Sequence, residues 1–277
     1  MKINKILIFS YILIIILILL ILYQFYLLLK KYNNKNIEKF KNNKIIFLDY
    51  NTVKNFLIND NDNYVKNFTK KDLKARNVNS INDYIINSSK CIKNFSNNEK
   101  QIIYKGCIEA DKFLKNYNNI LDGNEISKLK WKFALTYYNN YEYEEGFPHT
   151  REDIIFLSEK LIPKELNENF INTLIHEKIH IYQRYNNSKI EKIINKLGFY
   201  KYDIIKDNNR ANPDLNNYLY KNKNNDILQC VYNNNPISIS DVNCLNNNNI
   251  YEHPYEYIAY KIANEYNKSL VNKYINL

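Results

Sequence analysis

Residues 165–185 read ELNENFINTLIHEKIHIYQRY, a stretch with no glycine or proline. Apolar side chains recur three or four residues apart along it: Ile171, Ile175, Ile179 and Tyr182. This spacing predicts an α-helix with one buried face. His176 and His180 are four residues apart, so on such a helix they lie on one face and can bind a single metal ion.

The two histidines and Glu177 form the pattern HExxH. Neutral imidazoles suit Zn²⁺, and a carboxylate beside the first ligand reaches a water on the metal, where it serves as general base and not as ligand. A catalytic zinc usually takes three protein ligands and a water. The pattern therefore predicts one zinc ion, Glu177 as base, and a third ligand from elsewhere in the chain.

Residues 251–266, YEHPYEYIAYKIANEY, are the best source of that third ligand. Pro254 suits the first position of a helix, which places Glu256 in the first turn. An apolar stripe with two small residues would let this helix pack closely against the motif helix: Ile258, Ala259, Ile262 and Ala263. His253 is a rival, because imidazole is a better intrinsic zinc ligand than a carboxylate, and Glu252 is a second rival.

With these features the sequence resembles the gluzincin branch of the HExxH zinc metallopeptidases, over about residues 129–266. In that family a glutamate on a second helix supplies the third ligand, and a small residue follows three positions later, as Ala259 follows Glu256. The family often has an aspartate one position further on, bonded to a ligand histidine, where this chain has Tyr260. The resemblance implies an α+β zincin-like domain, with a small antiparallel or mixed sheet packed on the motif helix. It also implies that Tyr260 or His149 stabilises the oxyanion.

Two strands are expected upstream of the motif. Residues 129–137 alternate apolar and polar side chains, which predicts a half-buried strand, and Asn139-Asn140 marks a turn. Residues 149–157 read as a second strand. In the family such a strand borders the cleft and pairs with the extended substrate. His149 would then polarise the scissile carbonyl or bind the substrate, and the alternative is a histidine that merely ends a strand.

Local signals predict further helices. Ser96 and Glu99 form a capping box, so residues 97–117 are expected to be helical. A helix over residues 188–197 is expected to end at Gly198.

Residues 203–250 are expected to form a long loop, with its asparagine runs at 233–235 and 246–249 on the surface. Within it, Arg210 is a candidate clamp for a substrate carboxylate. The neighbouring Asn212-Pro213-Asp214 is also a common turn sequence.

Residues 6–29 are almost wholly apolar and are interrupted only by Ser10 and Gln24. As a helix this run would span about 36 Å, enough to cross the hydrocarbon core of a bilayer. It is longer than the apolar part of a signal peptide, and no small-residue cleavage site follows it. We expect a short tail (1–5), a single anchor in the lipid bilayer (6–29), a polar tether (30–45) and a catalytic domain (46–277).

The side of the membrane on which the domain lies is left open by two opposing signals. Two lysines precede the apolar run and six follow it closely, which favours a cytoplasmic domain: Lys2 and Lys5, then Lys30, Lys31, Lys35, Lys39, Lys41 and Lys44. The four cysteines form two local pairs, as disulfides of an oxidising compartment would: Cys91 with Cys107, and Cys230 with Cys244. Reduced core cysteines are the alternative.

The expected function is hydrolysis of peptide or protein substrates, with Glu177 activating a zinc-bound water. The chain carries a net charge of +10, but its sequence contains no basic helix with interleaved aromatic residues. No nucleic-acid partner is therefore expected. One alternative is a catalytically silent, membrane-tethered zincin-fold binding module, although such a module has no need of Glu177. Another is a metal-dependent hydrolase of non-peptide amides.

Overall fold

The computed structural model describes residues 2–205, 208–244 and 251–275. The chain forms two compact units, Met1–Ile45 and Ile46–Leu277. In the first, helix α1 runs without a break over Lys2–Lys44, so the residues expected as a tether continue the helix. Its segment Tyr11–Lys31 is long and apolar enough to cross a membrane.

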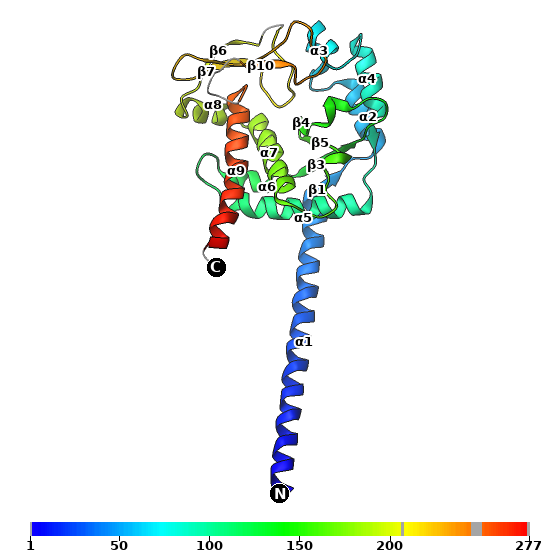
Figure 1. Ribbon diagram of the computed structural model, residues 1–277, viewed down its shortest axis with the longest axis vertical. Coiled ribbons are helices and arrows are strands. Elements are labelled where there is room, and N and C mark those ends of the chain that lie inside the picture. Colours follow the sequence, from blue (N-terminus) through cyan, green and yellow to red (C-terminus); the bar gives the residue numbers. More distant parts are fainter. Residues whose placement is uncertain (1, 206–207, 245–250, 276–277) are drawn as a thin grey trace. The chain divides into compact units, whose positions relative to one another are not determined.

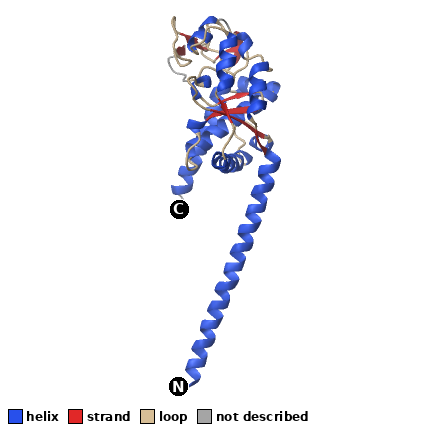
Figure 2. Cartoon of the chain, turned by 90° about the vertical axis from the view of Figure 1, so that its right-hand side faces the viewer, coloured by secondary structure: helices blue, strands red, loops and turns tan. Residues whose placement is uncertain are grey.

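The second unit mixes helices and strands, as the sequence predicts, around a mixed five-stranded sheet (Figure 2, strands in red). Its strands are β1 (Ile45–Phe47), β2 (Ile92–Lys93), β3 (Trp131–Thr136), β4 (His149–Arg151) and β5 (Ile154–Ser158). The order is β1-β3-β5-β4, with β2 also paired to β3. Strands β3 and β5 are parallel, whereas β4 runs antiparallel to β5 and β2 antiparallel to β3.

Helices cover both faces of this sheet (Figure 1). On one face, α2 (Tyr50–Asn59) and α4 (Ile81–Lys90) share an apolar cluster with Ala134 and Phe156. On the other face, α5 (Asn97–Lys115) and α7 (Glu168–Tyr185) surround Trp131: Asp111 of α5 accepts its indole N–H, and Nζ of Lys178 of α7 lies 4.0 Å from its ring. The shorter helices are α3 (Lys70–Ala75), α6 (Gly123–Lys128) and α8 (Asn187–Lys196), with 3₁₀ turns at Val65–Asn67, Tyr143–Gly146 and Glu159–Leu161.

Two strand predictions are wrong in detail. β3 was expected to be half-buried, but Ala134 and Thr136 are buried as well, because helices pack on both faces. Residues 149–157 form two strands and not one. The chain reverses at Glu152, which adopts φ +51°, and β4 then pairs with β5 as a hairpin in which His149 faces Phe156.

Other local predictions are confirmed. The Ser96 capping box begins α5, and Gly198 follows α8 with φ +89°. In α7, Asn167 caps the first turn and the four expected apolar residues are all buried: Ile171, Ile175, Ile179 and Tyr182.

The region expected as a long loop contains two small antiparallel sheets. One is formed by β6 (Tyr200–Ile204), β7 (Tyr218–Lys221) and β8 (Ile227–Leu228), the other by β9 (Cys230–Tyr232) and β10 (Val242–Cys244). Strands of two to five residues are too short for the alternation that reveals a strand in sequence. The expected surface loop at 246–249 lies outside the described residues.

Of the two local disulfides that the cysteine spacing allows, one is present. Cys230 and Cys244 are bonded across β9 and β10. Cys91 and Cys107 are both buried and neither is in a disulfide, and the Sγ of Cys91 lies 3.1 Å from the carbonyl oxygen of Tyr141.

Helix α9 (Pro254–Ile275) begins at the expected proline. It runs beside α7, as Figure 1 shows for the orange-to-red and lime helices. Ala259 and Ala263 are buried, so the small side chains allow the close approach that the sequence predicts.

Candidate active site

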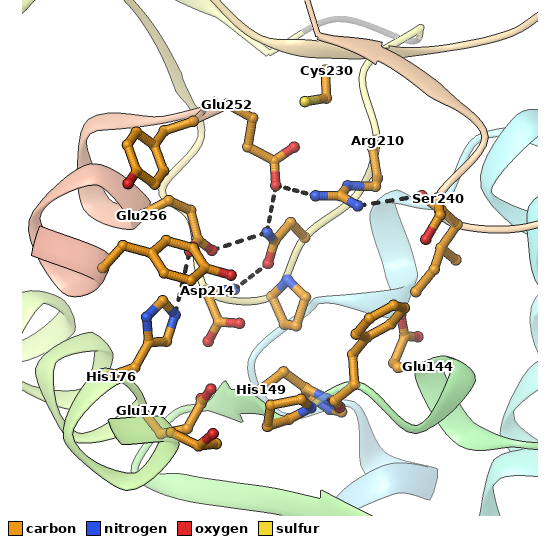
Figure 3. A pocket seen from close by; sticks show the side chains of 18 of the residues that line it. Glu144, His149, His176, Glu177, Arg210, Asp214, Cys230, Ser240, Glu252 and Glu256 are labelled. Atoms are coloured by element: carbon orange, nitrogen blue, oxygen red, sulfur yellow. Dashed lines mark hydrogen bonds and ion pairs between the residues drawn. The ribbon is translucent and has the colours of Figure 1, made fainter. Parts of the chain in front are cut away.

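The packing of α7 against α9 brings three possible ligand atoms together, from His176, His180 and Glu256. Figure 3 shows His176 and Glu256 facing one another. The Nε2 atoms of His176 and His180 are 2.9 Å apart. Oε2 of Glu256 lies 3.3 Å from the first nitrogen and 3.7 Å from the second. All three side chains are largely buried, so their lone pairs converge in a place that water reaches poorly.

This spacing fits zinc. Ligands about 2.05 Å from a tetrahedral zinc ion lie about 3.3 Å from one another, and the three observed separations bracket that value. The donor set of two imidazoles and one carboxylate is also that of a catalytic zinc site, which keeps a fourth position for water or substrate.

The charges around the three ligands favour a cation. Burial would lower the pKa of His180, but the carboxylates of Asp214 and Glu256 outweigh it and raise that pKa to about 9. Burial opposes ionisation of Glu256 too, yet the two histidines hold its pKa well below the usual range. The same negative field would stabilise a divalent ion, which displaces the proton when it binds.

A glutamine orients one ligand. Nε2 of Gln183 donates to the carbonyl oxygen of Tyr255 at 3.0 Å, so its Oε1 is turned towards His180 and accepts from Nδ1–H at 2.8 Å. With Nδ1 protonated, Nε2 of His180 is free to present its lone pair to a metal. Gln183 therefore also ties α7 to the first turn of α9.

His176 has a different surrounding. Its Nδ1 is buried and has no hydrogen-bond partner among the described residues. The ring of Tyr260 packs edge-on against it, with centroids 4.3 Å apart. At the position where the family has an aspartate, Tyr260 therefore contacts the ligand histidine by aromatic packing.

Asn212 supports the third ligand. Its Nδ2 donates to Oε1 of Glu256 at 3.3 Å and to Oε1 of Glu252 at 2.7 Å. Its Oδ1 accepts from the backbone N–H of Asp214 at 2.9 Å. Because Oε1 of Glu256 is held in this way, Oε2 is the atom turned to the histidines.

Glu177 is fixed beside the three ligands. Its Oε2 accepts from the hydroxyl of Thr150 at 2.9 Å. Burial and the nearby carboxylate of Asp214 raise the pKa of Glu177 well above its usual value. Burial, with Glu256 adding to it, also raises the pKa of Asp214 to about 6.

The outer edge of β4 is already occupied. The backbone N–H of Thr150 donates to Oδ1 of Asp214 at 2.7 Å, and its carbonyl accepts from Arg184 at 3.1 Å. An extended substrate cannot pair with the strand at Thr150 in this arrangement. This argues against the expectation that residues 149–157 bind the substrate as an added strand.

The two rival ligands, His253 and Glu252, do not join the cluster of His176, His180 and Glu256. Nε2 of His253 lies 3.1 Å from Oδ1 of Asn216, and its Nδ1 accepts the N–H of Tyr255 at 3.0 Å. Both ring nitrogens are thus engaged elsewhere. Glu252 is ion-paired with Arg210, which also donates to the carbonyl of Ile239. That pairing neutralises Arg210, the candidate carboxylate clamp.

A pocket of about 490 Å³ opens beside the three ligands and is lined by Glu177, Tyr260 and His149 (Figure 3). His149 is 4% exposed, and burial lowers its pKa to about 4, so the ring is neutral at pH 7. Its Nδ1–H donates to the carbonyl of Phe147 at 3.0 Å, which leaves Nε2 without a proton. In this tautomer His149 accepts hydrogen bonds and cannot stabilise an oxyanion.

A buried network holds the loop that carries Asn212 and Asp214. Arg76 makes a bidentate ion pair with Glu144, with Nε to Oε1 at 2.9 Å and Nη2 to Oε2 at 2.7 Å. It also donates to the carbonyl of Ala211 at 3.1 Å. The backbone N–H of Ala211 donates in turn to Asp72 at 2.9 Å.

Sequence reasoning missed four of these residues. Gln183 carried a usable signal, since it lies three positions after His180 and so near it on the helix. Asn212 and Asp214 were interpreted as a turn, and Thr150 as part of a strand. Their contacts join segments 27 to 64 residues apart, which no local pattern records.

Comparison of the chain with protein-family models, with curated proteins and with solved structures finds no match in any of the three.

Proposed function

We propose that this protein is a membrane-anchored, zinc-dependent metallopeptidase with a gluzincin-like site on a zincin-like domain. The observation that carries the proposal is the convergence of His176, His180 and Glu256 beside a buried Glu177. His176, His180 and Glu256 would hold the ion. When bound, Zn²⁺ supplies Lewis acidity, which lowers the pKa of a water and polarises a carbonyl.

Glu177 would move the proton. The Thr150 hydroxyl holds one of its carboxylate oxygens at 2.9 Å and leaves the other free to take a proton from the attacking water. Burial keeps the carboxylate poorly solvated, so it is a stronger base than a surface glutamate. The same group would deliver the proton to the leaving amine.

Tyr260 is the better candidate for binding the oxyanion. Tyr260 is 46% exposed. Partial desolvation of its hydroxyl, with the carboxylates of Glu256 and Glu177, raises its pKa to about 12, so it keeps its proton and can donate. Its ring already lines the pocket beside His176. His149, the other candidate, is better suited to accept a hydrogen bond from substrate.

The test is metal analysis of the full-length protein in detergent, run beside digestion of a peptide library. We expect about one zinc per chain and cleavage that a chelator abolishes. Glu177→Gln should keep the zinc and lower turnover by about 10²–10⁴-fold, because a general base is lost and no ligand is.

Each alternative has its own outcome. Zinc without turnover on any peptide would favour the silent binding module. Cleavage of simple amides but not of peptides would favour the other hydrolase. A protein that binds no zinc at all would rule out the proposal and both of these alternatives.

A further inference from the structure

Two asparagine side chains line the pocket on helix α7, ahead of the metal ligands. Asn169 is exposed and Asn172 is half-buried. They precede His176 by seven and four residues, so all three side chains lie on one face of the helix. The pocket therefore has a face of side-chain amides that continues from the first histidine of the metal group.

The amide nitrogens of this face are available to a ligand. Oδ1 of Asn172 is enclosed by the protein, so Nδ2 is the atom that this side chain presents to the pocket. Within the described chain, neither Nδ2 of Asn172 nor the side chain of Asn169 makes a hydrogen bond. Thr173 lines the pocket too, but its hydroxyl already donates to the carbonyl oxygen of Asn169 at 3.1 Å. The two asparagines thus offer donors that the fold leaves unused.

The main chain of a peptide substrate needs such partners, because the nearby strand edge is occupied. At Thr150 of β4, Asp214 accepts from the backbone N–H and Arg184 donates to the carbonyl oxygen. A peptide that binds in extended form commonly pairs its N–H and C=O groups with a free strand edge. An asparagine side chain can replace that pairing, since its amide carries the same kinds of donor and acceptor as a peptide bond.

The spacing along α7 suits an extended peptide. Four residues of helix advance about 6 Å, so Asn172 lies about that far from His176 along the helix axis. In an extended chain, carbonyl groups on one side recur every second residue, at about 6.8 Å. A substrate that runs along this face with its scissile carbonyl at the proposed zinc would therefore bring a second carbonyl close to Nδ2 of Asn172.

We propose that Asn172, with Asn169 beyond it, binds the main chain of an extended peptide substrate next to the scissile bond. Nδ2 of Asn172 donates to a substrate carbonyl and so replaces the strand pairing that β4 does not offer at Thr150. Because the main chain is recognised, the side chains of the substrate at this position can vary. This inference rests on the proposed peptidase function and names how that site recognises its substrate.

The test removes the main-chain hydrogen bond from each partner in turn. A parent peptide is compared with analogues in which one non-scissile amide is replaced by a trans carbon–carbon double bond, which keeps the shape of the chain but lacks N–H and C=O. For the zinc-loaded full-length enzyme we expect one analogue, altered close to the scissile bond, to have a kcat/KM about 3- to 10-fold below that of the parent, as for the loss of one hydrogen bond.

The enzyme variants assign that loss to residues. Asn172→Ala should lower kcat/KM for the parent by a similar factor but should not lower it further for that analogue, because the same hydrogen bond is already missing. Asn169→Ala should show the same coupling, by a smaller factor, with a bond further from the scissile one. Asn195→Ala, the same change at an exposed position of α8 outside the pocket, is the matched control and should cleave every peptide like wild type.

Two results would overturn the inference. One is an Asn172→Ala enzyme that cleaves the parent like wild type or loses the same factor on every analogue. The other is a loss in Asn172→Ala that changes with the side chains of the substrate and not with its main chain, because the amide face would then bind a side chain. Alanine favours helices, so loss of folding is not expected to obscure either result.

Binding separates this inference from the proposed function. Zinc-loaded Glu177→Gln should bind the parent more tightly than the critical analogue, and adding Asn172→Ala should remove that difference. If this holds while wild type cleaves nothing, the peptidase proposal fails and the main-chain site stands. If wild type cleaves the parent and all analogues alike, the inference fails and the peptidase stands.

Discussion

The two sides of the candidate active site are built in different ways. His176, Glu177 and His180 come from consecutive turns of α7, and Glu256 from the first turn of α9, so regular helices position the ligands. Across from them, Asn212 and Asp214 lie in an irregular segment between β6 and β7. That segment is held by side chains from remote parts of the chain, Arg76 and Asp72 among them.

The helices thus carry the groups proposed to bind the metal, and the loop segment carries groups that support them. The helical side depends on helix geometry and on one packed helix pair, which tolerate many surface changes. The loop side depends on single buried hydrogen bonds and ion pairs, each of which fails when one partner is removed. We therefore expect substitution of a ligand to abolish metal binding. Substitutions on the loop side should weaken stability or zinc affinity by smaller amounts.

The largest effect is expected at the third ligand. Glu256→Ala should lose zinc during dialysis against a weak chelator, because two histidines alone remain. His253→Ala should keep zinc, since both nitrogens of His253 bind other groups. Metal analysis of the two dialysed proteins is the measurement. Zinc loss in His253→Ala with retention in Glu256→Ala would exchange the two assignments.

Arg76→Met tests the loop side. It leaves the buried Glu144 carboxylate without its counter-charge, so we expect a loss of about 3–5 kcal/mol in unfolding free energy. The matched control is Lys132→Met, which breaks an ion pair with Asp153 of the same 2.7 Å length at the surface. There the loss should be about 0–1 kcal/mol.

Urea unfolding of the detergent-solubilised protein would measure both variants of this pair. Adding Glu144→Gln to Arg76→Met should recover part of the loss by removing the unpaired charge. Equal losses for the buried and surface pairs would show that the network does not hold the loop.

The Arg76–Glu144 pair also predicts a pH dependence. Burial opposes ionisation of Glu144, but Arg76 outweighs it and lowers the pKa of Glu144 from 4.5 to about 2. Between these values the unfolded state binds more protons, so stability is fully present above about pH 5 and falls as the pH drops towards 2, by on the order of 3 kcal/mol. Glu144→Gln should lack this part of the acid-induced loss. If wild type and Glu144→Gln lose the same stability in acid, another carboxylate is responsible.

The contrast between the helical side and the loop side also explains which parts of the site could be predicted from the sequence. Helix spacing, the capping box and Pro254 predicted α7, α5 and α9, and a resemblance placed Glu256 beside the histidines. All of these signals lie within one or two helical turns. Asp214 binds Thr150 across 64 residues, and Arg76 binds Glu144 across 68, so these partners become visible only once the chain is folded.

The Cys230–Cys244 disulfide links β9 and β10 next to the loop side, where the backbone N–H of Arg210 donates to the carbonyl of Cys230. It closes a loop of about 15 residues, so Cys230→Ser should cost about 3 kcal/mol by the chain-entropy estimate. Thiol labelling of the protein from its native membrane should find two thiols, Cys91 and Cys107, after unfolding, and four after reduction. That result would place the domain in an oxidising compartment. Four free thiols before reduction would agree with the lysine bias and a cytoplasmic domain.

The smallest effect is expected at Asn212, where the two sides of the site meet. Asn212→Ala removes the hydrogen bond to Oε1 of Glu256 but leaves every ligand in place. Outer partners of metal ligands are typically worth 10–100-fold in affinity, so zinc should bind more weakly by about that factor. Competition with a fluorescent chelator would measure it. Asn212→Leu, which keeps a side chain of similar size but also lacks the donor, should weaken zinc binding by a similar factor. If both variants bind zinc like wild type, the helices alone position Glu256, and the loop serves only the pocket.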